Sequence, residues 1–341
     1  MRTTLVSVVC AALLAGSPVH AQSAARDTIP QAELVRRLSS ALDSLSSAGS
    51  FSGVVVLARN GAPVLERAYG MADREAGRAN AVDTRFNLGS INKVFTATAI
   101  RQLAAQGQVN LDSTLAAYLP DYPNQEVARR VTLRQLMEHR AGMGGNVFGI
   151  PASGSRMTLR HNRDFLPLFA GEALQFEPGS ANRYCNVCYV VLGSVVERVS
   201  GQDYYDYIRQ NVYRPAGMSS TGHYALDSLP ANTAVGYTMG EDRAGPLRRN
   251  DDLLPGRGSS AGGGYSTAHD LLRFVAALRG GRIPGGPPAG LGVAGGSPGV
   301  NATLEGGLPG GYDLVVLANL DPRAAGRVGE LLRGWMGIAE D

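Results

Sequence analysis

Lysine is almost absent from this sequence of 341 residues. The chain has 32 Lys and Arg residues in total, and a single one of them, Lys93, is a lysine. These positive charges are nearly matched by 29 Asp and Glu residues, so that the formal net charge is only +3. A balance this close to neutral gives no electrostatic basis for binding nucleic acid or an anionic membrane, and neither is expected as a partner.

Cysteine is scarce as well. Of the 3 cysteines, Cys10 lies near the N-terminus, and Cys185 and Cys188 form a C-x-x-C pair in "YCNVCYV". The pair is either a small disulfide or redox couple, or two small buried side chains. The second interpretation is favoured, because no thioredoxin-like βαβ pattern surrounds the pair. Since no second Cys/His cluster occurs, no metal site is expected, and no cofactor is needed.

The sequence has no apolar run long enough to cross a bilayer. Its N-terminal apolar stretch extends only from Leu5 to Ala15, and small residues follow it up to Ala21. This pattern is typical of a secretory signal peptide. Residues 1–21 are therefore predicted to be removed, and the protein is predicted to be exported to the periplasm or the medium without stable membrane insertion. A lipoprotein anchored at Cys10 is the minor alternative.

The chain is predicted to begin and end with helices and strands of one sheet. Leucines at helical spacing predict a helix over 31–48, and two β-rich runs flank Asn60-Gly61, a strong hairpin signal. The apolar run at 312–320 predicts a buried central strand, which a closing helix follows. Helical spacing also recurs through the middle of the chain, over residues 90–106, 132–139, 189–201 and 203–218.

This order predicts an α/β (α+β) fold, in which terminal helices flank an antiparallel sheet and a mostly helical lobe is inserted. The predicted domains are a discontinuous sheet domain over 22–88 and 255–341, and a helical lobe over 89–254.

The stretch "GSINKVF" places Ser90 three residues before the only lysine, at the start of a predicted helix. Positions i and i+3 share a helix face, so Ser90 and Lys93 are expected to be neighbours. A serine hydroxyl needs a base to become a good nucleophile, and a buried lysine can lose its proton near neutral pH, whereas an arginine cannot. A chain that uses arginine everywhere else thus has a chemical reason to keep lysine here.

The segment "FNLGSINKVFTATAIRQL" resembles the nucleophile helix of the penicillin-recognising serine hydrolases. This family includes the class C β-lactamases, the D-Ala-D-Ala carboxypeptidases and the family VIII-type esterases. The resemblance extends from "FSGVVVLARNG" through "LMEHRAGM", "FEPGSANRYCNVCYVVLG" and "GRGSSAGGGYSTAHDL" to "LVVLANLDP". It implies a β-lactamase/transpeptidase-like fold with Ser90 as the acylated nucleophile and Lys93 as its base.

The family's Tyr-x-Asn motif is matched by "YCN", which supplies Tyr184 and Asn186 just before a predicted helix. The resemblance implies that Tyr184 shares the proton of Ser90 with Lys93 and passes it to the leaving group. It also implies that Asn186 donates a hydrogen bond to the acyl-side amide of the substrate or to Lys93.

The third motif departs from the family pattern. Where relatives carry Lys-Thr-Gly or His-x-Gly on a strand, this chain has "VAGGSPG", with Val293 at the position of the cation. The N–H of Gly296, or of a neighbour such as Ser297, is still expected to complete an oxyanion hole with Ser90, because only a backbone group is needed. A substrate carboxylate would lack a partner unless Arg257 or another loop arginine replaces the missing cation.

The histidines are assigned no catalytic part. His139 and His269 fall in predicted helices, where packing or capping is expected, and His161 and His223 fall in predicted loops. No serine lies in a G-x-S-x-G elbow, so a Ser-His-Asp triad is not expected.

These features predict an exported serine hydrolase that forms an acyl-enzyme and cleaves small carboxylic esters or amides, with neutral esters favoured. The alternatives are a β-lactamase, a D-Ala-D-Ala carboxypeptidase or a D-aminopeptidase that acts on β-lactams or peptidoglycan-like peptides. A rival of another class is a binding or scaffold protein of the same fold whose site has decayed. The sequence makes no prediction of the oligomeric state.

Overall fold

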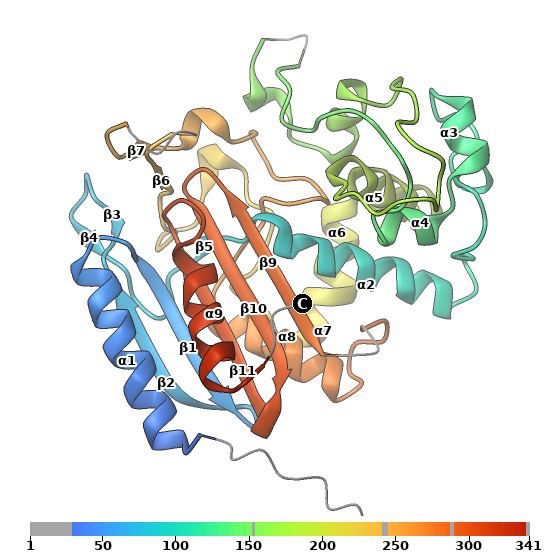
Figure 1. Cartoon of the computed structure of the whole chain (residues 1–341). Coiled ribbons are helices and arrows are strands. Elements are labelled where there is room, and N and C mark those ends of the chain that lie inside the picture. Colours follow the sequence, from blue (N-terminus) through green and yellow to red (C-terminus); the bar gives the residue numbers. More distant parts are fainter. Residues whose placement is uncertain (1–28, 152–153, 241–244, 287–289, 339–341) are drawn as a thin grey trace, which may run out of the picture.

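A computed structural model describes residues 29–151, 154–240, 245–286 and 290–338 (Figure 1). The predicted signal peptide, residues 1–21, and Cys10 within it lie outside the described residues. Within those ranges, no helix is both long and apolar enough to span a membrane.

The helices and strands alternate along the chain in an order that places strands near both ends. The α-helices are α1 (Gln31–Ser47), α2 (Asn92–Ala105), α3 (Gln125–Arg130), α4 (Leu133–Met137), α5 (Asn186–Ser200), α6 (Tyr204–Ile208), α7 (Arg214–Ala216), α8 (Ala268–Arg279) and α9 (Ala324–Trp335). The strands are β1 (Gly53–Arg59), β2 (Ala62–Tyr69), β3 (Met71–Asp73), β4 (Arg78–Ala79), β5 (Phe86–Asn87), β6 (Tyr237–Thr238), β7 (Arg248–Arg249), β8 (Tyr265–Ser266), β9 (Leu291–Ser297), β10 (Val300–Leu308) and β11 (Tyr312–Ala318).

The main sheet is antiparallel and has five strands in the order β2-β1-β11-β10-β9. The N-terminal and C-terminal parts of the chain therefore share one sheet, which confirms the predicted fold class. Asn60 and Gly61 connect β1 to β2 with φ angles of 51° and 82°. Positive φ at both central residues suits the right-handed twist of a hairpin, and Asn and Gly tolerate it best. The outermost strand at the other edge is β9.

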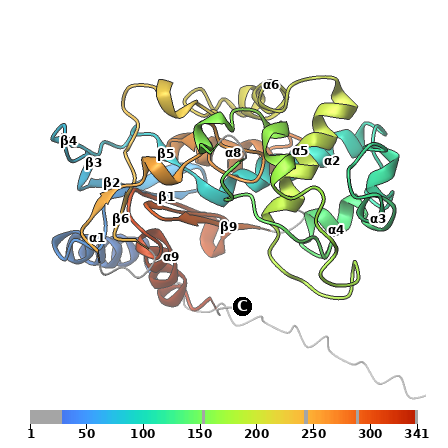
Figure 2. The same cartoon turned by 90° about the horizontal axis from the view of Figure 1, so that it is seen from above.

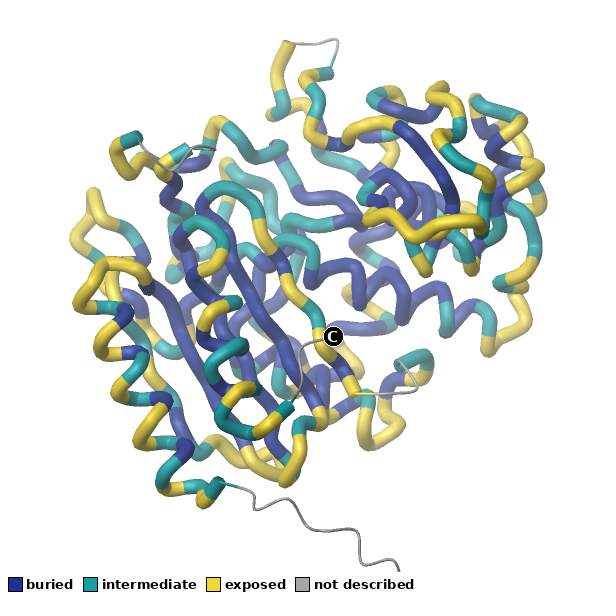
Figure 3. Tube along the Cα trace, in the orientation of Figure 1, coloured by how far each residue is buried: buried dark blue, intermediate teal, exposed yellow. Residues whose placement is uncertain are grey.

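Helices cover both faces of this sheet. The helices α1 and α9 lie side by side on one face, and α8 covers the other (Figures 1 and 2). On α1, Leu34, Leu38 and Leu42 are fully buried, because a spacing of four residues keeps them on one helix face. The opposite side of α1 is exposed (Figure 3).

The helix α2 lies in the interior of the helical part. Every residue from 92 to 100 is buried, and the dark trace of α2 in Figure 3 shows this burial. A helix in such a place must find partners for its polar side chains. The Thr96 hydroxyl accordingly lies 2.7 Å from the Tyr204 hydroxyl and donates to the Ser260 carbonyl at 2.7 Å.

The predicted helix over 203–218 is confirmed over residues 204–216, and it contains one irregular turn. α6 passes into a π-helical turn, Arg209–Tyr213, before α7 begins. Pro215 lies in α7, and its ring lacks the N–H of a regular helix and collides with the preceding turn. The wider turn ahead of it provides the room that the ring requires.

Candidate active site

A short 3-10 turn, Gly89–Ile91, presents Ser90 just before α2 begins at Asn92. Gly89 has a φ of +49°, and its N–H donates to Asn87 Oδ1 at 2.9 Å. Asn87 itself belongs to β5, which pairs with β8. The turn is therefore fixed from both ends, and Ser90 occupies a defined, half-buried position.

The edge strand β9 packs directly against this turn. A methyl group on Gly295 would lie 2.0 Å from the Leu88 carbonyl oxygen and 2.9 Å from the Ser90 nitrogen. A methyl group on Gly89 would in turn lie 2.9 Å from the Gly296 nitrogen. Only glycine permits so close an approach of two backbones, and the approach brings Gly295 and Gly296 of β9 next to the backbone of Gly89 and Ser90.

Two side chains contact the hydroxyl of Ser90. The Lys93 Nζ lies 3.1 Å from the Ser90 Oγ, and the Tyr184 hydroxyl lies 2.5 Å from the same oxygen. The Lys93 Nζ also stands 4.8 Å from the centre of the Tyr184 ring. The serine hydroxyl is thus in hydrogen-bond contact with an amine and a phenol at once.

Lys93 is buried although it is a lysine. Its side chain comes from the interior helix α2 and is 7% exposed, and its Nζ donates to the Ala261 carbonyl oxygen at 2.6 Å. Burial disfavours the charged form and lowers the pKa of Lys93 to about 7. A large fraction of the amine is therefore neutral near pH 7 and can accept a proton.

Tyr184 stands at the mouth of the site, with 56% of its surface exposed. Partial burial of the phenol disfavours its charged form and raises the pKa of Tyr184, and the hydrogen bond to Ser90 partly offsets this effect. Its ring packs at 4.8 Å, centre to centre, on His139, a residue that also accepts a hydrogen bond from the Cys185 N–H at 3.1 Å. His139, which follows α4, therefore holds both the ring of Tyr184 and the backbone of the next residue, Cys185.

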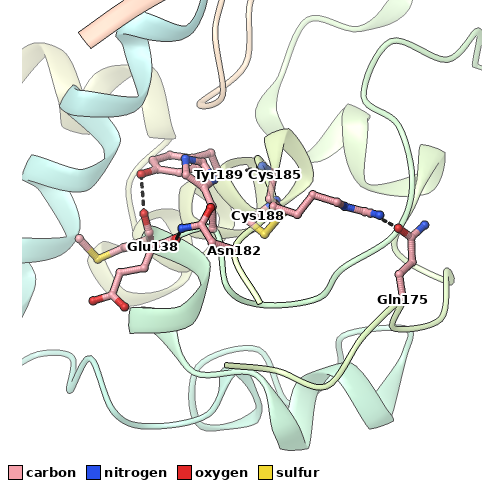
Figure 4. The surroundings of a disulfide bond; sticks show 9 residues. Glu138, Gln175, Asn182, Cys185, Cys188 and Tyr189 are labelled. Carbon is pink, nitrogen blue, oxygen red and sulfur yellow. Dashed lines mark hydrogen bonds between the residues drawn. A yellow bond between two sulfur atoms is a disulfide. The ribbon is translucent and has the colours of Figure 1, made fainter. Parts of the chain in front are cut away.

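Cys185 and Cys188 form a disulfide, so the favoured interpretation of two separate buried side chains is wrong (Figure 4). Cys185 caps α5, and Cys188 lies in its first turn, where the Cys188 N–H donates to the Cys185 Sγ. The helical start brings two residues of this spacing onto one face. The bond ties the residue after Tyr184 to the first turn of α5.

A cavity of about 690 Å³ opens in front of Ser90. Asn186, Gly296 and Ser297 line it together with Ser90. Among the described residues, Asn186 forms no hydrogen bond to Lys93 or to any other side chain, so its amide is free to face a ligand. Val293 shares a strand face with Gly295, and it packs against the apolar core and does not line the cavity.

Of His139, His223 and His269, only His139 lies elsewhere than the sequence predicts. The prediction that His139 lies in a helix is wrong, because it follows the end of α4 with a φ of 60°. His269 does lie in α8, where it contacts Glu66. His223 is in a loop but is buried, and its Nε2 lies 2.7 Å from the Asn92 amide nitrogen.

Sequence reasoning misses two contributors to the site, Ala261 and His139. Ala261 acts through its backbone carbonyl group, which every residue type has, so the only signal in the sequence is its position in a Gly-rich segment. His139 becomes adjacent to Tyr184 through folding alone. Within the described ranges, no group of three or more His, Cys, Asp or Glu side chains is arranged to hold a metal ion.

An antiparallel sheet with helices on both faces, and a serine held by a buried lysine and a tyrosine, define the class of a serine hydrolase with a Ser-x-x-Lys nucleophile. The chain belongs to the β-lactamase family, whose model matches residues 34–337. The resemblance found in the sequence is thereby confirmed, as is its assignment as a serine hydrolase.

Individual relatives include both esterases and penicillin-binding proteins. The chain is 32% identical to the esterase EstB of Burkholderia gladioli, over 88% of this chain and 83% of that protein. It is 30% identical to penicillin-binding protein 4 of Amycolatopsis lactamdurans, over 62% of this chain and 55% of the relative. The solved penicillin-binding protein of Bacillus halodurans superimposes with a TM-score of 0.76 at 30% identity, covering 86% of this chain and 98% of that one. The chain spans about half the length of several penicillin-binding relatives that it matches.

The contact of β9 with the nucleophile turn can be tested with two alanine substitutions on the same strand. Gly295→Ala is expected to lower kcat/KM for a chromogenic ester about a hundredfold, because the added methyl displaces β9 from Ser90. Gly292→Ala is the matched control, since nothing lies within 4 Å of a methyl group there. Equal activity of the two variants would contradict the proposed close contact.

The disulfide predicts the response of the two cysteines to alkylation. The peptide with Cys185 and Cys188 should take up iodoacetamide in the denatured protein only after reduction, as mass spectrometry can check. Because the closed loop is short, reduction should lower the free energy of unfolding by only about 2 kcal/mol. The Cys185→Ala/Cys188→Ala double variant should be insensitive to reductant, and uptake of label without reduction would rule the bond out.

Proposed function

We propose that the protein is an exported serine hydrolase that works through an acyl-enzyme on Ser90 and cleaves small carboxylic esters or amides, with esters favoured. The observation that carries this proposal is the position of the Ser90 Oγ, 3.1 Å from the Lys93 Nζ and 2.5 Å from the Tyr184 hydroxyl. A serine with a base in hydrogen-bond reach is the arrangement that nucleophilic catalysis needs.

Acylation begins at the neutral amine of Lys93. The Ser90 Oγ attacks the carbonyl carbon of the substrate while its proton passes to the Lys93 Nζ. The carbonyl oxygen becomes an oxyanion, which accepts hydrogen bonds from the N–H groups of Ser90 and Gly296. When the intermediate collapses, the bond to the leaving alcohol or amine breaks, and Tyr184 delivers a proton to it and recovers one from Lys93.

Deacylation repeats these steps with water as the nucleophile. The water gives its proton to the base formed by Lys93 and Tyr184 and attacks the acyl carbon. The bond between that carbon and the Ser90 Oγ then breaks, the Oγ takes the proton back from the base, and the carboxylic acid leaves. The oxyanion of this step uses the same two N–H groups. Asn186, whose amide is free, is suited to hold a polar group of the substrate on the wall of the cavity.

The preference for esters rests on the third motif. β9 has Val293 where relatives have a cation, so this strand gives a carboxylate beside the scissile bond no cationic partner. β-Lactams and D-Ala-terminated peptides have such a carboxylate, whereas an ester does not need one. The similarity to an esterase along most of both chains supports the same choice.

Export is supported by two independent features. The first is the signal-like pattern of residues 1–21. The second is the Cys185–Cys188 disulfide, a bond that persists in oxidising compartments and is rare in the bacterial cytosol. We infer a periplasmic or extracellular protein after cleavage near Ala21.

The acyl-enzyme is tested by labelling and by substitution of the base. A fluorophosphonate should add to Ser90 in the folded protein, and Ser90→Ala should remain unlabelled in intact-mass spectra. Lys93→Arg is expected to lose about a hundredfold to ten-thousandfold in ester turnover, because arginine cannot accept the proton. Lys93→Met provides the same test if the arginine variant does not fold. A folded wild type with neither adduct nor turnover would instead support the decayed scaffold.

The pH dependence follows from the pKa of Lys93, which burial lowers to about 7. The amine is a base only when neutral, so kcat/KM should fall as pH drops through about 7 and level off above it. The unfolded chain has a lysine pKa of about 10.4 and binds a proton that the folded chain has released. The free energy of unfolding should therefore rise between about pH 7 and about pH 10.

The Lys93→Met variant is the control for this pH dependence. It should lack both the activity and the part of the stability increase that belongs to Lys93. A wild-type activity profile that stays flat from about pH 5 to about pH 9 would show that no group with a pKa near 7 is the base.

A further inference from the structure

The cavity in front of Ser90 is lined by positive side chains. Among the described residues that line it are Arg156, Arg248 and Arg257, and none is Asp or Glu. The remaining wall is largely apolar. Its large apolar side chains are Val147, Phe148, Leu159, Phe165, Leu226, Leu253 and Leu254.

Two of the three arginines are already occupied. Arg156 donates to the backbone carbonyls of Phe148 and Asp252. Arg248 forms an ion pair with the Asp252 carboxylate at 2.8 Å. Both terminal nitrogens of Arg156 therefore already donate, and the charge of Arg248 is already paired with a carboxylate.

Arg257 differs from both. Its Nε donates to the His223 carbonyl oxygen at 2.7 Å, and its Cζ lies 3.7 Å from the centre of the Tyr205 ring. A guanidinium stacked on an aromatic ring and held by one nitrogen has little freedom left. In the described part of the chain, its two terminal nitrogens have no hydrogen-bond partner and it forms no ion pair.

The support of Arg257 continues to the nucleophile helix. Tyr205 is buried, and its hydroxyl donates to the Gly258 carbonyl oxygen at 2.8 Å. His223 is buried as well and contacts Asn92, the residue next to Lys93. Burial and the charge of Arg257 lower the pKa of His223 to about 3, so the imidazole stays neutral beside the guanidinium. The cation is thus fixed relative to the catalytic helix.

We propose that Arg257 binds a carboxylate of the substrate with its two free terminal nitrogens. A planar fork of two N–H donors fits a carboxylate in a bidentate manner. The substrates are then small esters or amides with an apolar part and a carboxylate remote from the scissile bond. This inference rests on the proposed function and refines its substrate. The cation that β9 lacks is supplied from a loop that also lines the cavity, so anionic esters replace neutral ones as the favoured class.

The test compares matched pairs of esters that differ by one carboxylate. One pair is mono-p-nitrophenyl glutarate and p-nitrophenyl pentanoate, in which the acyl part differs. The other pair is 4-acetoxybenzoate and its methyl ester, in which the leaving group differs. The wild type should prefer the anionic member of at least one pair, and that pair identifies the side of the scissile bond that faces Arg257.

Arg257→Gln should lower kcat/KM for the preferred anionic ester about tenfold to hundredfold, mainly through KM, and leave the neutral ester within about twofold. Arg257→Lys keeps the charge without the fork and should recover only part of the loss. Arg248→Gln is the control, because it removes a charge from the same cavity at a paired position.

Three outcomes would overturn the proposal. They are an equal loss for both members of a pair in Arg257→Gln, an equal selectivity change in Arg248→Gln, and no anionic preference in either pair. If any of these outcomes occurs while the neutral esters are still hydrolysed, the Arg257 proposal fails but the proposed serine hydrolase function stands. If no ester turns over, the same pairs are compared as competitors of fluorophosphonate labelling at Ser90. Protection of the wild type by the anionic member alone, lost in Arg257→Gln, would still support the site.

Discussion

The site depends on the burial of one ammonium group. Water no longer stabilises the charge of Lys93, so the amine releases its proton near neutral pH, and what remains is a base in contact with Ser90. The Ala261 carbonyl keeps this amine in place in either protonation state. The interior position of α2 makes this possible, because a helix on the surface would leave the lysine hydrated and charged.

Glycine solves the second problem of the site, which is to bring backbone groups next to the serine. The turn at Gly89, the edge strand at Gly295 and the loop at Gly262 meet around Ser90. A side chain at Gly89 or Gly295 would collide with a backbone nitrogen or oxygen, and one at Gly262 would make a tight contact. In the proposed mechanism, N–H groups and not side chains receive the oxyanion. That choice explains how the third motif can lose its cation while its glycines keep the backbone contact.

Charge and specificity are distributed over different walls of the cavity. β9 gives an uncharged wall, the start of α5 gives Tyr184 and the free amide of Asn186, and the loop before β8 gives a fixed guanidinium at Arg257. In the function proposed for this protein, the chemical step and the recognition of the substrate rest on separate elements. A family fold can keep the first unchanged while loops alter the second.

The sequence by itself determined what depends on neighbours along the chain. Local geometry fixes the hairpin at Asn60-Gly61, where a turn of two residues joins two strands. It also fixes the buried stripe of α1 and the contact between Ser90 and Lys93, because residues three or four apart share a helix face. The π-helical turn within the helix over 203–218 and the position of His139 were not predicted, because neither follows from the spacing of apolar residues along the chain. Only the tertiary structure brought the Ala261 carbonyl to Lys93, closed the Cys185–Cys188 bond and stacked Arg257 on Tyr205, because the first and the last join residues far apart in the sequence and the second depends on how α5 begins.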